Sequence, residues 1–278
     1  MRNWSLVYFT LATQSAIGLV WVSVPARWLG KNAAADFSTV PMLSALALSG
    51  LGLSMALTHL AKPGLAPHAI RNLAFSWLSR EVLLVQAFAG AVALSILLPF
   101  LNIAGGRILP ELAACLLGGA ALYAMVSVYL LRTVPVWNSP ATYLEFAGSA
   151  ILLGGALRAA ITAFGTTTQS GWSPVTTFAG IAIFLGLILK AAAIPPSLAA
   201  DKAARNQTWY PSTAGFFTTG RLLAVRQGFY LAGLLPALAA ISWPGPAWLL
   251  SCLALASFGT GEVLGRQRFY RSYRRVGL

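Results

Sequence analysis

The sequence predicts an all-α protein, a polytopic membrane helix bundle with about eight transmembrane helices in a single domain over residues 1–278. The first observation is composition: 9% of the residues are charged, 58% are hydrophobic and the mean hydropathy is +0.73. A soluble domain carries about 25% charged residues, so this protein could not cover its surface in water. The second observation is that apolar runs long enough to cross a bilayer, about 20 residues each, recur along the sequence.

The expected spans follow from these runs and from the helix breakers between them. In order they are 5–24, 41–59, 82–100, 111–131, 144–164, 175–194, 228–243 and 247–265. The first run is long for a signal peptide and contains polar residues, so it is expected to be a transmembrane helix. Prolines fall at the predicted ends, among them Pro25, Pro110 and Pro140, whereas Pro236 is expected to kink the seventh span. All nine tryptophans lie at or near predicted ends, as in the aromatic belts of membrane proteins.

The basic residues predict the orientation in the membrane. With an even number of spans, one side carries Lys62, Arg71, Arg80, Arg132, Lys202, Arg205, Arg221, Arg226 and the arginines of the tail. The other side holds little beyond Arg27, Lys31 and Arg107. The positive-inside rule therefore predicts cytoplasmic termini in a cell inner membrane. The net charge of +13 is interpreted as contact with anionic lipid headgroups and not with nucleic acid, because the charges lie between and after apolar runs.

The two longest connections, 60–81 and 195–227, fall on this basic side together with the tail 266–278. We expect them to form a docking platform for partner subunits, with Lys202, Arg205, Arg266 and Arg268 as docking residues. Two alternatives stay open: the long connections are linkers alone, and the basic and aromatic tail anchors to lipid headgroups.

Cysteine and histidine usage predicts no metal and no haem on this protein. Cys115 and Cys252 both fall inside apolar runs and form no CxxC motif. An iron–sulfur cluster needs about four thiolates. His59 and His68, the two histidines of the sequence, flank a Lys-Pro-Gly break and are not placed to ligate a haem from facing helices.

The segment from His59 to Glu81 is the candidate quinone site. His59 ends the second span, Glu81 opens the third, and the loop between them returns to the same face. Ionisable groups at the edge of hydrocarbon are expensive and usually functional. Histidine and a carboxylate can exchange protons near neutral pH, as the two-electron, two-proton chemistry of quinones requires.

Within this site His59 is expected to hold one quinone oxygen and Glu81 to relay protons or orient His59. Arg71, Arg80 and Trp77 are expected to shape the site. The alternative for both principal residues is structural, because a cation is favourable at a helix C-terminus and a carboxylate at a helix N-terminus.

Further charges within the apolar runs receive simpler interpretations. Lys190 is expected to snorkel to the headgroups, and Glu111, Glu145 and Glu262 to lie at the interface. Arg158 is deeper, and pairing with a carboxylate, lining a polar cavity and snorkelling stay open for it.

Several segments resemble the dimethyl sulfoxide reductase membrane-anchor family. They are 59–81 with its Ser76-Trp77-Leu78-Ser79-Arg80-Glu81 core, 133–140, 221–236 and 261–270, in order along most of the sequence. The resemblance implies an eight-helix anchor without haem, a molybdopterin catalytic partner and a ferredoxin-like iron–sulfur partner. It also implies a quinone or quinol (menaquinone or ubiquinone) bound near His59 and Glu81. The sequence is similar too to the anchors of cytoplasmic sulfite dehydrogenases.

The expected function is therefore that of a membrane anchor that passes electrons between quinone and an iron–sulfur partner, with the catalytic cofactor on another subunit. The predicted orientation favours quinone reduction coupled to cytoplasmic sulfite oxidation. One alternative is quinol oxidation in a dimethyl sulfoxide reductase-type complex for anaerobic or sulfur respiration. Alternatives of another class are a secondary transporter and a purely structural, lipid-binding anchor.

Overall fold

A computed structural model describes residues 4–29, 39–59, 72–103, 105–165, 173–207, 214–243 and 245–273. Within these ranges all the regular structure is helical, which confirms the predicted fold class. The helices are α1 (Trp4–Leu29), α2 (Thr39–His59), α3 (Trp77–Phe100), α4 (Ile108–Tyr129), α5 (Pro140–Gly165), α6 (Pro174–Ala192), α7 (Ile194–Gln207), α8 (Ala214–Ser242) and α9 (Ala247–Arg271). Eight helices in the described part are long and apolar enough to cross a membrane.

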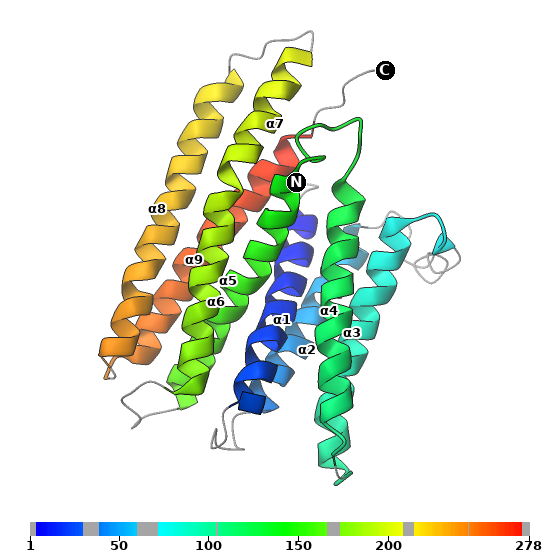
Figure 1. Ribbon diagram of the computed structural model, residues 1–278, viewed down its shortest axis with the longest axis vertical. Helices are drawn as coiled ribbons and strands as arrows, with labels where there is room; N and C mark the ends of the chain where they lie inside the picture. Colours follow the sequence, from blue (N-terminus) through cyan, green and yellow to red (C-terminus); the bar gives the residue numbers. More distant parts are fainter. Residues whose placement is uncertain are drawn as a thin grey trace.

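Helix α1 lies at the centre of the bundle, between α5 and α4 in Figure 1. In its most apolar stretch 83% of the residues are buried, against 17–61% in the other spans. A pair of glycines permits the close packing of α1 on α5: a Cβ atom on either Gly18 or Gly154 would overlap the backbone of the opposite helix. Small residues at helix crossings are the usual means of close packing in membranes, where the lipid supplies no hydrophobic force between helices.

The remaining helices form antiparallel hairpins around α1 (Figure 1). Consecutive helices pair as α1 with α2, α3 with α4, α5 with α6, and α8 with α9, and α9 then packs on α5. The hairpins place the start of α1, α3, α5 and α8 and the end of α2, α4, α6 and α9 at one end of the bundle. We call it the basic end, because the exposed cations Arg132, Lys202, Arg221 and Arg271 lie there.

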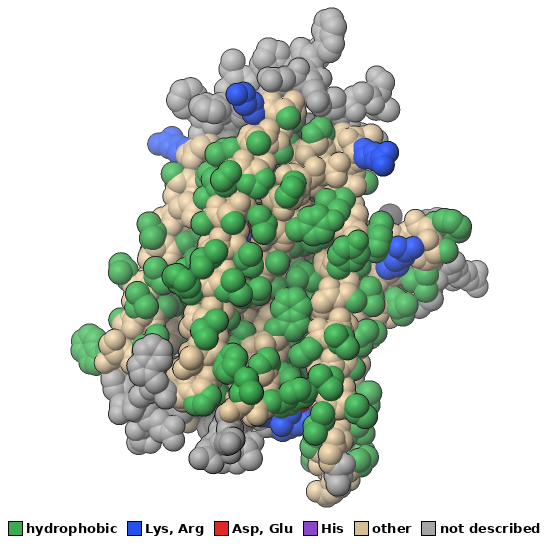
Figure 2. Space-filling view, viewed as in Figure 1, with side chains coloured by type: hydrophobic (Ala, Val, Ile, Leu, Met, Phe, Trp, Pro, Cys, Tyr) green, Lys and Arg blue, Asp and Glu red, His purple; other side chains and the backbone are tan. Residues whose placement is uncertain are grey.

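The outer surface suits lipid. Figure 2 shows hydrophobic side chains along the length of the helices on one face, with the visible Lys and Arg side chains at helix ends. Large apolar side chains such as Leu116, Phe184 and Leu235 are more than half exposed to the surroundings. In water this surface would be unfavourable, whereas hydrocarbon solvates it directly.

Several predicted boundaries were wrong, chiefly in the segment 195–227. The structure places helix in most of this expected loop, because α7 covers Ile194–Gln207 and α8 begins at Ala214. Pro195 and Pro196 occupy the first turn of α7, where a missing N–H costs little, and an alanine-rich stretch follows. Residues 77–81, also expected in a loop, form the first turn of α3. Pro25 lies inside α1 and does not end it.

Candidate functional site

Two buried polar regions lie at the basic end. The first, which we call the Glu81 site, consists of Glu81 from α3, Tyr129 from α4, Tyr270 from α9 and Thr10 from α1. The second, which we call the ionic cluster, consists of Glu145, Ser149, Lys190, Arg226, Tyr230, Glu262 and Arg266.

A capped turn fixes the start of α3. Ser76 is the N-cap, and its hydroxyl accepts a hydrogen bond from the backbone N–H of Ser79 at 3.2 Å. The guanidinium of Arg80 donates to the carbonyl oxygens of Leu73 and Ala74 at 2.8 and 2.7 Å and lies 4.3 Å from the ring centroid of Trp77. Arg80 therefore ties the preceding turn to the helix.

Glu81 is the unusual residue of the first region. Its side chain is 2% exposed, and among the described residues its Oε1 atom has no hydrogen-bond partner. It lies on the face of α3 that carries the buried residues Val85 and Phe88, so it points into the bundle. Buried polar atoms are nearly always hydrogen-bonded, and an exception at membrane depth is a candidate functional group.

Two tyrosine hydroxyls lie within electrostatic range of this carboxyl but form no hydrogen bond with its Oε1. The Oη atoms of Tyr129 and Tyr270 are 3.0 Å apart, and the Tyr270 hydroxyl donates to Thr10 Oγ1 at 3.4 Å. Glu81 interacts electrostatically with both tyrosines. An aromatic layer covers them: Trp137 packs edge-on against Tyr129 and donates its indole N–H to the Phe269 carbonyl oxygen at 2.8 Å.

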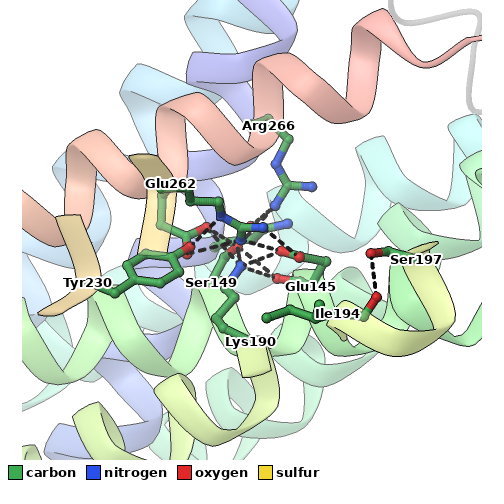
Figure 3. A network of polar contacts seen from close by, with 10 residues as sticks. Glu145, Ser149, Lys190, Ile194, Ser197, Tyr230, Glu262 and Arg266 are labelled. Atoms are coloured by element: carbon green, nitrogen blue, oxygen red, sulfur yellow. Dashed lines mark hydrogen bonds and ion pairs between the residues drawn. The ribbon is translucent and has the colours of Figure 1, made fainter. Parts of the chain in front are cut away.

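The ionic cluster joins four helices (Figure 3). Lys190 Nζ donates to Glu145 Oε2 and Glu262 Oε2, both at 2.9 Å, and to Ser149 Oγ at 2.7 Å. Arg226 binds Glu145 through two parallel bonds of 2.7 and 2.5 Å. Such bidentate pairs are the strongest form of charged hydrogen bond.

Tyrosine and a third cation complete the cluster. Tyr230 donates to Glu262 Oε1 at 2.6 Å and accepts from Arg226 Nε at 2.8 Å. Arg266 donates to Gln14 Oε1 at 2.7 Å and to Ser149 Oγ at 3.1 Å, and its guanidinium lies 3.8 Å from the Phe146 ring centroid. Lys190 and Arg226 thus meet the carboxylates of Glu145 and Glu262 between α5, α6, α8 and α9, and Arg266 joins them through Ser149.

Comparison with known proteins places this sequence among membrane anchors. The family described as DMSO reductase anchor subunit (DmsC) matches residues 1–271. The protein belongs to this family. A curated relative, the C subunit of the anaerobic dimethyl sulfoxide reductase of Haemophilus influenzae, is 28% identical over 153 residues, which is 54% of this sequence and 54% of that protein. The match thus spans about half the length of this relative. No solved structure is significantly similar.

The other residues of the predicted quinone site in this DMSO reductase anchor subunit are His59, Arg71 and Trp77. His59 is the last residue of α2, but its side chain lies outside the described residues, as does the whole of Arg71. Trp77 is 37% exposed and packs edge-on against Tyr123 of α4, with ring centroids 5.6 Å apart. The predicted meeting of His59 and Glu81 therefore stays a prediction, and Trp77 lies on the outside of the α3–α4 hairpin.

The interpretations of Lys190 and Arg226 were wrong. Lys190, expected to snorkel, is 1% exposed, and Glu262, expected at the interface, is also 1% exposed. Arg226, counted among the loop charges, is buried too. A sequence signal was present: Glu145 and Ser149, Arg226 and Tyr230, and Glu262 and Arg266 are each spaced i, i+4 in apolar helices. That spacing puts each pair on one helix face.

The docking residues divide into buried and exposed. Arg266, proposed from the sequence as a docking residue, is 4% exposed and bonded inside the bundle, so the structure does not place it on the platform surface. Arg268 forms an ion pair of 3.0 Å with Asp201 of α7, and Lys202 is exposed. The side chain of Arg205 lies outside the described residues. A partly open pocket beside Arg268 reaches Glu145 and Arg226, so the cluster adjoins the surface of the basic end.

The opposite end has a smaller ion group. Glu111, expected at the interface, is buried, pairs with Arg27 and accepts a hydrogen bond from the Trp28 indole at 3.0 Å. Arg158 is buried as well, and its Nε and Nη1 atoms have no hydrogen-bond partner among the described residues. The described residues contain no group of three or more His, Cys, Asp or Glu that could hold a metal ion.

Proposed function

We propose that this anchor subunit binds a quinone or quinol, either menaquinone or ubiquinone, beside Glu81 and exchanges electrons between it and an iron–sulfur partner docked on the basic end. The observation that carries the proposal is the buried Glu81 carboxyl, whose Oε1 has no partner among the described residues. A carboxyl in such a position has capacity left for a ligand.

The chemistry of quinones fits these residues. Reduction of a quinone takes two electrons and two protons, and oxidation of the quinol returns them. In this proposal the electrons pass to or from the partner's cluster, one proton is exchanged with Glu81, and the other is exchanged with His59 at the end of α2. Since α2 and α3 are neighbours, both residues belong to the same end of the bundle. A general acid or base at each oxygen lowers the barrier to these transfers.

The surroundings support access from lipid. Leu78, Trp77 and Tyr123 form an exposed apolar and aromatic patch beside the start of α3. A quinone carries a hydrocarbon tail that remains favourably in the bilayer while the headgroup reaches a polar site at the interface. Amphipathic aromatic side chains are suited to that boundary.

Partner docking is proposed for the basic end. Exposed Lys202 lies on α7, and the exposed arginines at positions 132, 221 and 271 lie at the ends of other helices. The proposed partners are a ferredoxin-like iron–sulfur subunit and, through it, a molybdopterin catalytic subunit. The curated relative is named as one lettered component of a dimethyl sulfoxide reductase, which supports an assembly of several subunits.

The direction of electron flow is proposed from the predicted orientation. If the basic end is cytoplasmic, as the positive-inside rule predicts, the catalytic partner is cytoplasmic too. We propose on this ground that the complex reduces quinone with electrons from cytoplasmic sulfite. The relative's name favours the reverse direction, with quinol as donor. Assays of purified complex with sulfite and quinone, and with quinol and dimethyl sulfoxide, distinguish the two.

The test of the quinone site uses the complex in native membranes. Glu81→Gln and His59→Ala should each lower quinone-linked turnover by about 10²-fold, while turnover with a soluble dye that reacts directly with the catalytic partner is unchanged. Glu111→Gln is the matched control, because it makes the same substitution at the opposite end and should retain quinone-linked turnover per assembled complex. Full quinone-linked turnover in both site variants would show a purely structural anchor and overturn the proposal.

A further inference from the structure

Arg158 of α5 is a buried cation that belongs neither to the quinone proposal nor to the ionic cluster. It lies in the half of α5 that is farther from the basic end. We propose that its guanidinium binds the phosphate group of a phospholipid from the leaflet at the opposite end, at the junction of α1, α5 and α6. The proposal is independent of the quinone site, because Glu81 opens α3 at the basic end.

The guanidinium of Arg158 has no counter-charge in the described part of the protein. The residue is 7% exposed, and its Nε and Nη1 atoms are buried without a hydrogen-bond partner among the described residues. A guanidinium carries five N–H donors and keeps its charge in proteins. A buried charge without a partner is unfavourable, and at membrane depth it is a candidate binding site.

The acidic residues of the protein are placed elsewhere. Five of the six are described, and they lie in the ionic cluster (Glu145 and Glu262), in ion pairs with other arginines (Glu111 and Asp201) or at the basic end (Glu81). The sixth, Asp36, lies outside the described residues. We therefore look for the compensating anion outside this protein and include Asp36 in the test.

The neighbours of Arg158 on α5 show where its side chain projects. Gly154 packs on the backbone of α1, and Gly155 packs on Ala179 of α6, where an added Cβ atom would lie 2.9 Å from the carbonyl oxygen. Arg158 follows these glycines by four and three positions, so it lies on the face between them, one turn nearer the opposite end. Val22 of α1 and Ala179 form part of a small apolar cluster at this junction. These apolar side chains bring no hydrogen-bond acceptor to the guanidinium.

The depth of Arg158 is within reach of lipid phosphate. Phe164 of α5 and Trp248 of α9 are exposed at the opposite end with ring centroids 5.9 Å apart, as expected in an aromatic belt. Arg158 precedes Phe164 by six residues, so it lies about 9 Å deeper along the helix. A bilayer thins locally around an arginine within it, which brings headgroups toward the charge.

Phosphate is the ligand that fits this charge. Arginine and phosphate form strong charged hydrogen bonds with matching geometry. Lipid phosphates are the abundant anions at the membrane surface, and basic pockets between transmembrane helices bind lipid headgroups. A neutral acceptor, such as the carbonyl oxygen of a quinone, would leave the positive charge of Arg158 uncompensated.

The first experiment counts the lipids on the assembled complex after purification in mild detergent and extensive washing. Native mass spectrometry and phosphorus analysis should find a phospholipid on the wild-type complex that is missing from Arg158→Met. Arg158→Lys keeps the charge but not the planar guanidinium, and should retain less of this lipid than the wild type. Arg132→Met is the matched control, because it removes an exposed arginine at the basic end and should retain the wild-type number.

The second experiment returns lipid to the delipidated complex and follows thermal unfolding. Phosphatidylglycerol should raise the melting temperature of the wild type by about 2–4 °C more than that of Arg158→Met. Diacylglycerol with the same acyl chains lacks the phosphate, and inorganic phosphate lacks the chains, so neither should stabilise the wild type. Without lipid, Arg158→Met should be at least as stable as the wild type, because it removes an uncompensated buried charge.

The outcomes decide between an external lipid and other solutions. Equal phospholipid retention in Arg158→Met and the wild type would overturn the proposal. Stabilisation of the wild type by diacylglycerol or by inorganic phosphate as large as that by phosphatidylglycerol would overturn it too, and this comparison needs no variant that assembles. Asp36→Asn should leave lipid retention and stability at wild-type levels. A less stable Asp36→Asn complex that shows no lipid dependence would make Asp36 the counter-charge and overturn the lipid assignment.

Discussion

The two polar regions at the basic end differ in how many hydrogen-bond partners surround a buried carboxylate. In the ionic cluster Glu262 contacts a lysine, a serine and a tyrosine within 2.9 Å. In the Glu81 site, one oxygen of an equally buried carboxyl has no hydrogen-bond partner among the described residues. Both are at the same end of one bundle, and they differ in the number of hydrogen-bond partners that neighbouring helices supply.

The comparison indicates that the ionic cluster stabilises the helix bundle and that the Glu81 site is available for chemistry. The ion group of the cluster joins α8 and α9 to α5 and α6 through side chains from all four helices. An underbonded carboxyl adds little to stability, and in the proposed function it is the group that exchanges a proton with the quinone. The cost of its burial is tolerated where function requires it.

The largest expected effect comes from breaking the cluster. Lys190→Met leaves Glu145 and Glu262 buried with less compensation and should lower the free energy of unfolding by about 3–5 kcal/mol. Thermal unfolding of the detergent-solubilised complex measures the loss. Lys202→Met makes the same substitution at an exposed lysine and should change stability by less than about 0.5 kcal/mol. Equal stability of the two variants would show that the cluster is not a structural clamp.

A smaller effect is expected from the tyrosine of the cluster. Tyr230→Phe removes the hydrogen bond to Glu262 and the acceptor of Arg226, and should cost about 1.5–3 kcal/mol, as for bonds to charged groups. The same thermal assay detects it. Combined with Lys190→Met, it should cost less than the sum of the two single losses, because both residues share Glu262 as a partner. Simple additivity would contradict a single coupled network.

The smallest expected effect is no change or a slight increase in the free energy of unfolding. Glu81→Gln removes a buried ionisable group with few partners, so the free energy of unfolding should be unchanged or higher by up to about 1 kcal/mol. The variant should nevertheless lose quinone-linked turnover. A destabilisation as large as that of Lys190→Met would make Glu81 a structural residue and remove the contrast between the regions.

Much of the fold followed from the sequence because hydrophobic length is a local property. The eight spans, the antiparallel order and the basic end could be predicted from apolar runs and loop charges. The helical nature of 194–207 was missed because two prolines suggested a loop, although the first turn of a helix accepts them. Glu81 could be predicted because it opens the third span, at the end of the recognisable segment that begins at His59.

The ionic cluster could not be predicted in the same way. Four of its charged members follow one another at intervals of 36 to 45 positions: Glu145, Lys190, Arg226 and Glu262. The i, i+4 spacings show which residues share a helix face, but they do not show which helices face one another. Lys190 was therefore interpreted by itself, and a single lysine near a helix end is expected to reach the headgroups.

The sequence by itself determined that this protein lies in a membrane, how many times it crosses, and which family it belongs to, because these depend on local hydrophobicity and on motifs. The tertiary structure alone decided which charges are neutralised and which carboxyl is left available. That choice depends on pairing between distant helices, and the energy of a buried charge is set by its nearest neighbours in space and not by its neighbours in the sequence.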